Sequence, residues 1–262
     1  MWLACGPGSQ CIEGIIVVGC LSSCNKPTSV RKNGPSRSGA KGSVPEPTDY
    51  REISRLRVNE LPYVFIIGFN KTGTRSLHNF FFRNGFPSVH YDGGRLGLTM
   101  LQNLVNGKKI FDGYDQGIKV FSDLIFINHS VDMQFNRFFR VMDRDYPNSY
   151  FIHNTRDTEN WIRSRTRHSA HRGAGSFLSM SLDAHNTTDI EEVKAIWRRE
   201  KERFEADVRQ YFDGCDRYLE LDIEKDDVCG LISKLLRIKL NCLHWQQIGK
   251  TDLSDISADG TG

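Results

Sequence analysis

An apolar segment that runs directly into a glycine-bounded loop constrains this chain more than any other feature. Residues 63–77 read YVFIIGFNKTGTRSL. The pattern predicts a buried strand, a loop and then a helix, an arrangement whose backbone N–H groups bind oxyanions. A nucleotide-triphosphatase P-loop has its lysine directly after the second glycine, followed by a hydroxyl residue for Mg²⁺. Here Thr74 follows Gly73 and Lys71 lies inside the loop, so the usual arrangement for metal-assisted γ-phosphate transfer is missing.

A second segment indicates which anion is bound. Residues 149–165 read SYFIHNTRDTENWIRSR, an apolar run that ends in Arg156 and a helical stretch that carries Ser164 eight residues later. The two segments together resemble the sulfotransferase superfamily. Its members combine a K-x-G-T loop for the 5′-phosphosulfate with an arginine and a serine for the 3′-phosphate of 3′-phosphoadenosine-5′-phosphosulfate (PAPS). Each motif is common by chance, but both in this order at predicted strand ends are fairly specific.

The resemblance implies roles for particular residues. Lys71 is expected to reach the oxygen that bridges phosphorus and sulfur, and Arg156 and Ser164 are expected to bind the 3′-phosphate. PAPS would be the cosubstrate, and no metal is expected. The alternatives are a solvated loop lysine and an ion pair of Arg156 with Asp157 or Glu159. The expected cofactor-binding residues are Lys71, Thr72, Gly73, Thr74, Arg75, Ser76, Arg156 and Ser164.

The acceptor must lose a proton during transfer, so a general base is expected near Lys71. Asp123 is the first candidate, because Phe121-Ser122-Asp123-Leu124 falls where many superfamily members carry their acceptor-activating residue. His90 is the second candidate, because a histidine needs little tuning of its pKa to act near neutrality. Asp92 or another carboxylate is the remaining possibility. Each of these residues could instead cap a helix or close a turn.

The fold class predicted is α/β, a three-layer P-loop-type fold with a central parallel sheet flanked by helices. Ligands of such sheets bind beyond the carboxyl ends of the strands, where both motifs lie. The similarity covers residues 62–252; residues 1–61 are expected to be a disordered tail and 253–262 a flexible one. Apolar patterning predicts strands at 63–67, 150–154 and 218–223, and helices at 74–84, 158–168, 189–212 and 227–236.

Charge and cysteine content set weaker limits. A net charge of +3 requires no nucleic-acid partner. The apolar run at 15–21 is shorter than the roughly 20 residues that span a bilayer, so no integral membrane segment is expected. The expected domain contains Cys215, Cys229 and Cys242 without close spacing, and a disulfide framework is not expected in a domain of this size.

The compartment is predicted from sequons. They occur at residues 70–72, 128–130 and 186–188, and each is a substrate for glycosylation in the secretory pathway. The first lies in the catalytic loop, where a glycan would block the phosphosulfate. This favours a cytoplasmic location, with a secretory or Golgi location as the alternative.

Two further segments flank the expected site. A basic stretch at 163–172 is expected to be a lip over the site or a solvated helix face. Residues 244–251 resemble the C-terminal segment that closes over the nucleotide in the superfamily. The longer glycine-rich motif of the cytosolic aryl and steroid branch is missing, which argues against membership of that branch.

The predicted function is transfer of a sulfuryl group from PAPS to an acceptor hydroxyl on a carbohydrate, a lipid or a small molecule. A non-catalytic binding protein with the same fold is the alternative. A P-loop nucleotide kinase is less favoured, because it would need a lysine after Gly73 and a metal-binding carboxylate on a neighbouring strand. Neither the acceptor nor the oligomeric state follows from the sequence.

Overall fold

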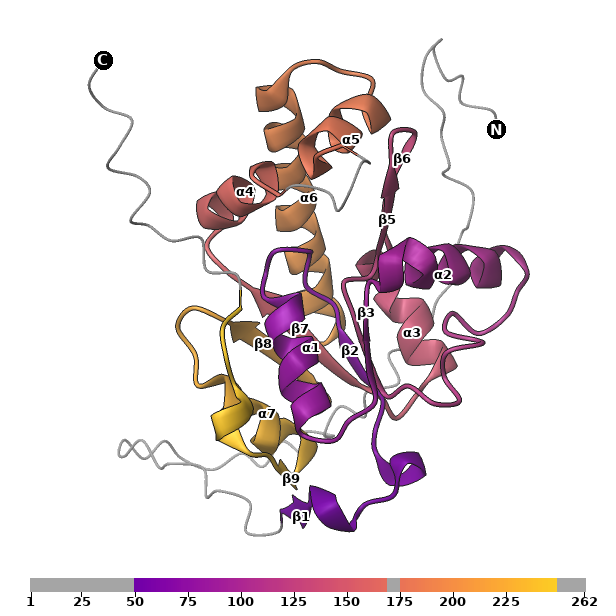
Figure 1. The fold of residues 1–262 in the computed structure, drawn as a ribbon, viewed down its shortest axis with the longest axis vertical. Coiled ribbons are helices and arrows are strands. Elements are labelled where there is room, and N and C mark those ends of the chain that lie inside the picture. Colours follow the sequence, from indigo (N-terminus) through magenta and orange to yellow (C-terminus); the bar gives the residue numbers. More distant parts are fainter. Residues whose placement is uncertain (1–49, 169–174, 249–262) are drawn as a thin grey trace, which may run out of the picture.

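The molecule has three layers around a parallel sheet (Figure 1). The computed structural model describes residues 50–168 and 175–248. Within these residues five parallel strands form the central sheet in the order β3-β4-β2-β7-β8, which confirms the predicted fold class. The strands of this sheet are β2 (Val64–Ile66), β3 (Ser88–His90), β4 (Val120–Ser122), β7 (Tyr150–Thr155) and β8 (Tyr218–Asp222).

The alternation of side chains along β2 assigns the helices to the two faces of the sheet, because successive residues of a strand point to opposite faces. Val64 and Ile66 pack with apolar side chains of α1 and α7. Phe65 and Ile67 pack in a second cluster with side chains of the other five helices. The helices are α1 (Thr74–Arg83), α2 (Arg95–Val105), α3 (Phe139–Asp145), α4 (Thr158–Thr166), α5 (Phe177–Ala184), α6 (Ile190–Tyr211) and α7 (Val228–Leu236).

The elements expected from apolar patterning are all present, with ends that move by one or two residues. The long helix expected over 189–212 is α6, and Asp189 caps it by accepting a hydrogen bond from the backbone N–H of Glu191. The patterning did not predict the elements between 88 and 145, among them the 11-residue helix α2. The strands in this range have three or four residues each, which is too short to show a clear period.

Two smaller sheets lie outside the central one. β5 (Ile125–Asn128) and β6 (Val131–Gln134) form an antiparallel hairpin, and β1 (Arg51–Glu52) pairs in parallel with β9 (Ile238–Lys239). The pairing of β1 shows that residues 51–52, which lie before the expected start of the domain at 62, belong to the packed structure. The remainder of the predicted N-terminal tail and residues 253–262 lie outside the described residues. No helix in the described ranges has the length and apolar character needed to cross a membrane.

Candidate active site

The loop between β2 and α1 is held from below by one buried side chain, that of Asn154 near the end of β7. Its Oδ1 accepts a hydrogen bond from the backbone N–H of Gly68 at 2.9 Å. Its Nδ2 donates to the backbone carbonyl and the hydroxyl of Thr72 at 2.9 and 2.7 Å. A Cβ at position 68 would lie 2.0 Å from the Asn154 carbonyl oxygen, so only glycine allows this close approach.

Replacing Asn154 by alanine is therefore expected to lower the free energy of unfolding by about 3 kcal/mol, because buried loop groups lose their partners. The exposed Asn106, whose amide donates to the Gln102 carbonyl, offers a matched control. Asn106→Ala is expected to change stability by less than about 0.5 kcal/mol. Chemical denaturation of both variants checks this, and equal effects would contradict the role given to Asn154.

The first helix of the chain's central fold, α1, begins directly after the glycine of the loop. Gly73 precedes the helix in the left-handed conformation, with φ 87°, and no side chain caps the helix in the described structure. A Cβ at Gly73 would lie 2.6 Å from Ile223 Cδ1. The first N–H groups of a helix have no intrahelical partner and carry partial positive charge, so this end of α1 is suited to an anion.

The second motif lies beside the first. Arg156 follows β7 directly and donates from Nη1 to the Lys71 carbonyl at 3.2 Å. Trp161 on α4 donates from its indole to the Asn70 carbonyl at 2.9 Å, which joins α4 to the loop. Ser164 is buried on the same helix.

Arg156 does form an ion pair, but neither of the two expected acidic residues is its partner. It pairs with Glu224 after β8. Asp157 instead caps α4, and Glu159 pairs with Arg198. Among the described residues, Arg156 Nε has no hydrogen-bond partner, so the guanidinium has hydrogen-bonding capacity left for a ligand.

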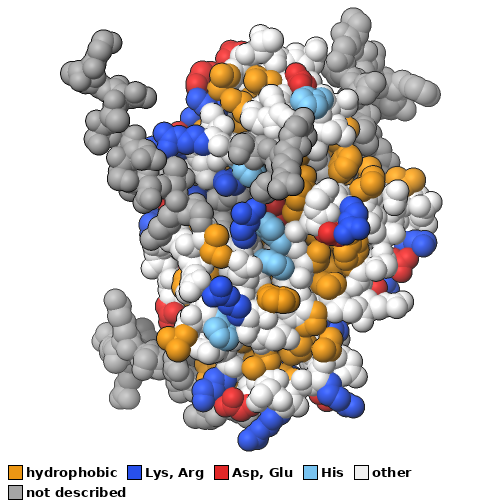
Figure 2. All heavy atoms as spheres, in the orientation of Figure 1, with side chains coloured by type: hydrophobic (Ala, Val, Ile, Leu, Met, Phe, Trp, Pro, Cys, Tyr) orange, Lys and Arg blue, Asp and Glu red, His pale blue; other side chains and the backbone are white. Residues whose placement is uncertain are grey.

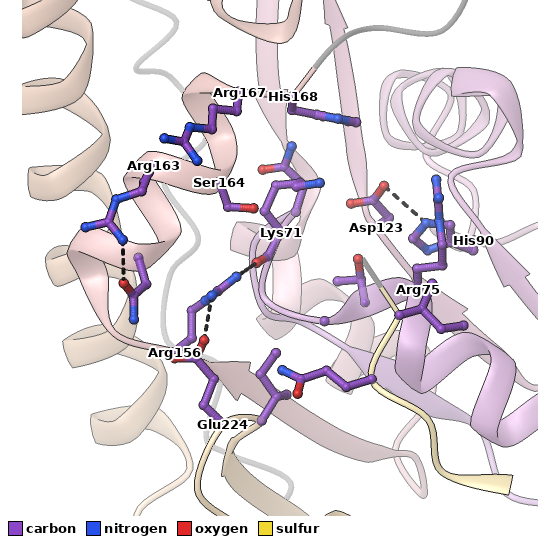
Figure 3. A pocket seen from close by; sticks show the side chains of 17 residues that line it. Lys71, Arg75, His90, Asp123, Arg156, Arg163, Ser164, Arg167, His168 and Glu224 are labelled. Carbon is purple, nitrogen blue, oxygen red and sulfur yellow. Dashed lines mark hydrogen bonds and ion pairs between the residues drawn. The ribbon is translucent and has the colours of Figure 1, made fainter. Parts of the chain in front are cut away.

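A single pocket of about 370 Å³ brings the two motifs together at the carboxyl ends of the strands (Figure 3). Figure 2 shows Lys, Arg and His side chains gathered in the middle of the corresponding face. The sequence-predicted residues that line this pocket are Lys71, Gly73, Thr74, Arg75, His90, Asp123, Arg156 and Ser164.

Thr72 and Ser76 do not line the pocket, although both were expected to hold the phosphate. The Thr72 hydroxyl donates to the Phe69 carbonyl at 2.6 Å beneath the loop. The Ser76 hydroxyl accepts from the backbone N–H of Ile248 at 2.8 Å. The Thr72 side chain therefore stabilises the loop itself, and the Ser76 side chain binds the segment that ends at Ile248.

Asp123 and His90, the two candidate bases, are neighbours. His90 Nε2 lies 3.6 Å from Asp123 Oδ2. The other ring nitrogen of His90 lies 3.1 Å from the Ser122 hydroxyl. Asp123 follows β4 with a left-handed backbone, φ 58°, which is a costly conformation for a non-glycine residue and is frequent at functional sites. Whichever of the two residues takes the proton, the other is in contact with it.

The environment shifts the pKa of each group in this unit. Burial raises the pKa of Asp123 to about 6, against the opposing effect of the Arg75, Lys71 and Arg165 charges. Burial and the Arg75 charge lower the pKa of His90 to about 4. His90 is therefore neutral near pH 7, and its lowered pKa makes it a weaker base than the sequence suggested. At that pH its contact with Asp123 is not an ion pair.

Lys71 lies in the centre of the pocket view (Figure 3). Burial lowers its pKa, and the Arg75 and Arg156 charges act in the same direction, while the Asp123 charge raises it. Lys71 also has a left-handed backbone, φ 68°. A partly desolvated ammonium among other cations gains more than a solvated one from an approaching anion.

One face of α4 adds further basic groups to the pocket. Asn160, Arg163, Ser164 and Arg167 line it, at the spacing i, i+3, i+4 and i+7 that places side chains on one helix face. This spacing could have been recognised in the sequence. The basic stretch at 163–172 was expected to be a lip over the site or a solvated helix face, but Arg165 in this stretch is buried. Its guanidinium is fully buried, 4.5 to 5.0 Å from the ring centres of Phe177, Trp197 and Trp161.

Residues 241–248, here called the C-terminal strap, run along α1 to the pocket. Asn241 N–H donates to Asn84 Oδ1 at 2.7 Å, and the Trp245 ring packs edge-on against Phe80. Gln247 and Ile248 line the pocket. The predicted closing segment thus reaches the site as far as residue 248, and 249–251 lie outside the described residues.

A disulfide joins the strap to α7, and the prediction of no disulfide was wrong. Cys229 on α7 and Cys242 in the strap bond to each other, 13 residues apart in sequence. Cysteine spacing could not reveal this pair, because only the packing of the strap beside α7 brings the sulfurs together.

Replacing Cys242 by serine is expected to lower the free energy of unfolding by about 3 kcal/mol, the value for a closed loop of similar length. Denaturation under oxidising conditions measures the loss. Both proteins in a reductant should be equally stable, because Cys215 is disulfide-bonded as well and a reductant cleaves every cross-link. Equal stability of variant and oxidised wild type would contradict the prediction.

Comparison with known proteins supports the same assignment. A family model described as the sulfotransferase domain matches residues 63–229, a range that contains Lys71, Asp123, Arg156 and Ser164. A search of curated proteins found no match. The matched range covers more than half of the chain, and its α/β architecture is that of the observed fold. The chain therefore belongs to the sulfotransferase family.

Proposed function

We propose that this sulfotransferase moves a sulfuryl group in line from PAPS to a hydroxyl of an acceptor. The observation that carries the proposal is the convergence of the Lys71 loop, the Arg156 and Ser164 pair and Asp123 on one pocket. The Lys71 loop and the pair of Arg156 and Ser164 can each bind one anionic group of the ligand, and Asp123 can act as a base beside the Lys71 loop. Three side-chain atoms find no hydrogen-bond partner within residues 50–168 and 175–248 and support a polar ligand here: Arg156 Nε, Asp123 Oδ1 and Asn70 Oδ1.

In this proposal the loop and the start of α1 hold the 5′-phosphate, with Gly73, Thr74 and Arg75 nearest to it. Lys71 donates to the oxygen between phosphorus and sulfur, where charge develops as the bond to sulfur breaks. Arg156 and Ser164 bind the 3′-phosphate, which takes the place of Glu224 as the partner of Arg156. No metal is assigned to the reaction, because the cations of the pocket neutralise the phosphates.

Asp123 accepts the proton of the acceptor hydroxyl as its oxygen attacks sulfur. The new bond joins that oxygen to sulfur, the sulfur–oxygen bond to the phosphate breaks, and 3′-phosphoadenosine-5′-phosphate leaves. His90 positions the carboxylate from its neighbouring place on β3. The acceptor is a hydroxylated molecule, with a carbohydrate as one candidate class.

Calorimetric titration with 3′-phosphoadenosine-5′-phosphate tests the cosubstrate. We expect micromolar binding, much weaker binding of ATP with Mg²⁺, and a loss of about 10 to 100-fold in Arg156→Ala, because a charged hydrogen bond contributes about 1.5 to 3 kcal/mol. Arg199, an exposed arginine on α6, is the matched control, and Arg199→Ala should bind like wild type.

Two results would overturn this assignment. One is the absence of binding by the wild-type protein, which would favour a non-catalytic member of the family. The other is tighter binding of ATP with Mg²⁺, which would favour a P-loop nucleotide kinase. Equal affinity in the two arginine variants would show that the nucleotide binds elsewhere.

A further inference from the structure

We infer that Asn128 and Asn186 are N-glycosylation sites of this protein, and that Asn70, which stands in the same kind of sequon, is not. The sequence alone cannot separate the three, because each satisfies the Asn-x-Ser/Thr pattern. The fold separates them by exposure. This inference concerns the surface and does not depend on the proposed reaction.

Asn70 cannot carry a glycan in the folded protein. It is 5% exposed, and its backbone carbonyl accepts the indole N–H of Trp161. The hydroxyl residue of its sequon, Thr72, is 1% exposed and bonded to Asn154 and the Phe69 carbonyl. Because the Asn70 side chain is buried at the pocket, a glycan on it would require the loop to open away from this fold.

Asn128 has the opposite environment. It ends β5 at the tip of the β5–β6 hairpin, and it is exposed together with the next two residues of the turn. Its Oδ1 accepts the backbone N–H groups of Ser130 and Val131 at 2.8 and 2.9 Å. These bonds orient the side-chain oxygen toward the turn and leave the Nδ2 side of the amide directed away from it.

Asn186 lies in the connection between α5 and α6. It is exposed and has a left-handed backbone, φ 52°. Figure 1 shows that this connection and the hairpin tip lie at the same end of the molecule. Neither Asn128 nor Asn186 lines the pocket, so glycans at both positions leave the pocket open.

The disulfide is an independent observation that favours the compartment in which sequons are used. Cys229 is buried and Cys242 is exposed, and they are bonded to each other. Structural disulfides form and persist in secreted proteins and in the endoplasmic reticulum, and they are rare in the cytosol. The buried state of Asn70 removes the reason for favouring the cytosol, and the cross-link favours the secretory alternative.

The modification is a transfer of an oligosaccharide from a lipid-linked diphosphate donor. The asparagine Nδ2 forms a bond to C1 of the first sugar and loses one proton. The bond between that carbon and the diphosphate oxygen breaks, and the lipid diphosphate leaves. No oxidation or reduction takes place.

The test uses the full-length protein purified from the cells that express it. Peptide N-glycosidase in heavy-oxygen water converts each glycan-bearing asparagine into labelled aspartate, and peptide mass spectrometry locates the label. We expect label at positions 128 and 186 and none at 70. Alkylation before and after reduction should modify Cys229 and Cys242 only after reduction.

Variants expressed in the same cells provide a second measurement. Asn128→Gln and Asn186→Gln should each remove one glycan step in a gel, and Asn70→Gln should remove none. An unlabelled wild type, or label at position 70, would overturn the inference, and a missing label at 128 or 186 would overturn it for that site. Free Cys229 and Cys242 thiols in the native sample would overturn the compartment argument.

Discussion

Lys71→Ala is expected to slow release of 3′-phosphoadenosine-5′-phosphate from PAPS by about 100-fold or more. The ammonium is proposed to stabilise charge that develops only as the sulfur–oxygen bond breaks, and one such donor contributes on the order of 3 kcal/mol to the transition state. Binding of the product nucleotide should fall by less than about tenfold, because the backbone of the loop and Arg156 remain. A single-turnover assay with PAPS measures the rate without a known acceptor, since water can accept the group.

Two control variants make the Lys71 result specific. Lys71→Arg is not expected to restore the rate, because a guanidinium fork does not replace a compact ammonium at this position. Lys108→Ala changes an exposed lysine that pairs with Asp112, and it should behave as wild type. A Lys71→Ala enzyme with full turnover would contradict the proposed role, whereas a wild type that binds nucleotide but never turns over would support the non-catalytic alternative.

Asp123→Asn is expected to lower kcat/KM by about 100-fold or more, because general-base catalysis contributes that much and an amide cannot take the proton. The wild-type kcat/KM should fall about tenfold per pH unit below pH 6, where Asp123, with its pKa raised to about 6, becomes protonated. This limb should be absent in the variant. The pH profile is measured with the first acceptor that supports turnover.

The free energy of unfolding of Asp123→Asn shows whether a lower rate comes from loss of the base or from loss of the fold. Burial raises the pKa of Asp123 above its unfolded value, so protonation of this group stabilises the fold, and that contribution is lost as pH rises through about 6. Asp123→Asn removes the buried charge and is therefore expected to keep or increase the free energy of unfolding at pH 7. Asp213→Asn, at an exposed position, should change neither rate nor stability.

A marked loss of stability in Asp123→Asn would contradict this interpretation.

His90→Gln tests the second candidate base in the same kcat/KM assay. Because the pKa of His90 is lowered to about 4, its replacement should reduce the rate less than Asp123→Asn does. The reverse order of effects would make His90 the base.

Local patterns determined much of this protein. The strand, loop and helix around Lys71, and the strand and helix that carry Arg156 and Ser164, follow from apolar runs and turn residues that act within about ten positions of one another. The parallel order of β2 and β7 then places both motifs at the same edge of the sheet, because the carboxyl ends of parallel strands coincide. The fold class and the placement of the two motifs at one edge of the sheet could therefore be predicted from the sequence.

Tertiary structure alone decided the features that join distant segments. The contact of His90 with Asp123 depends on the register of β3 against β4, and the burial that lowers the pKa of His90 also requires packing between elements. The pairing of Arg156 with Glu224 depends on β8 lying beside β7. The burial of Arg165 among aromatic rings and the bond between Cys229 and Cys242 also require packing between elements. Such contacts leave no local period in the sequence, because they reflect which elements become neighbours and not how each element forms.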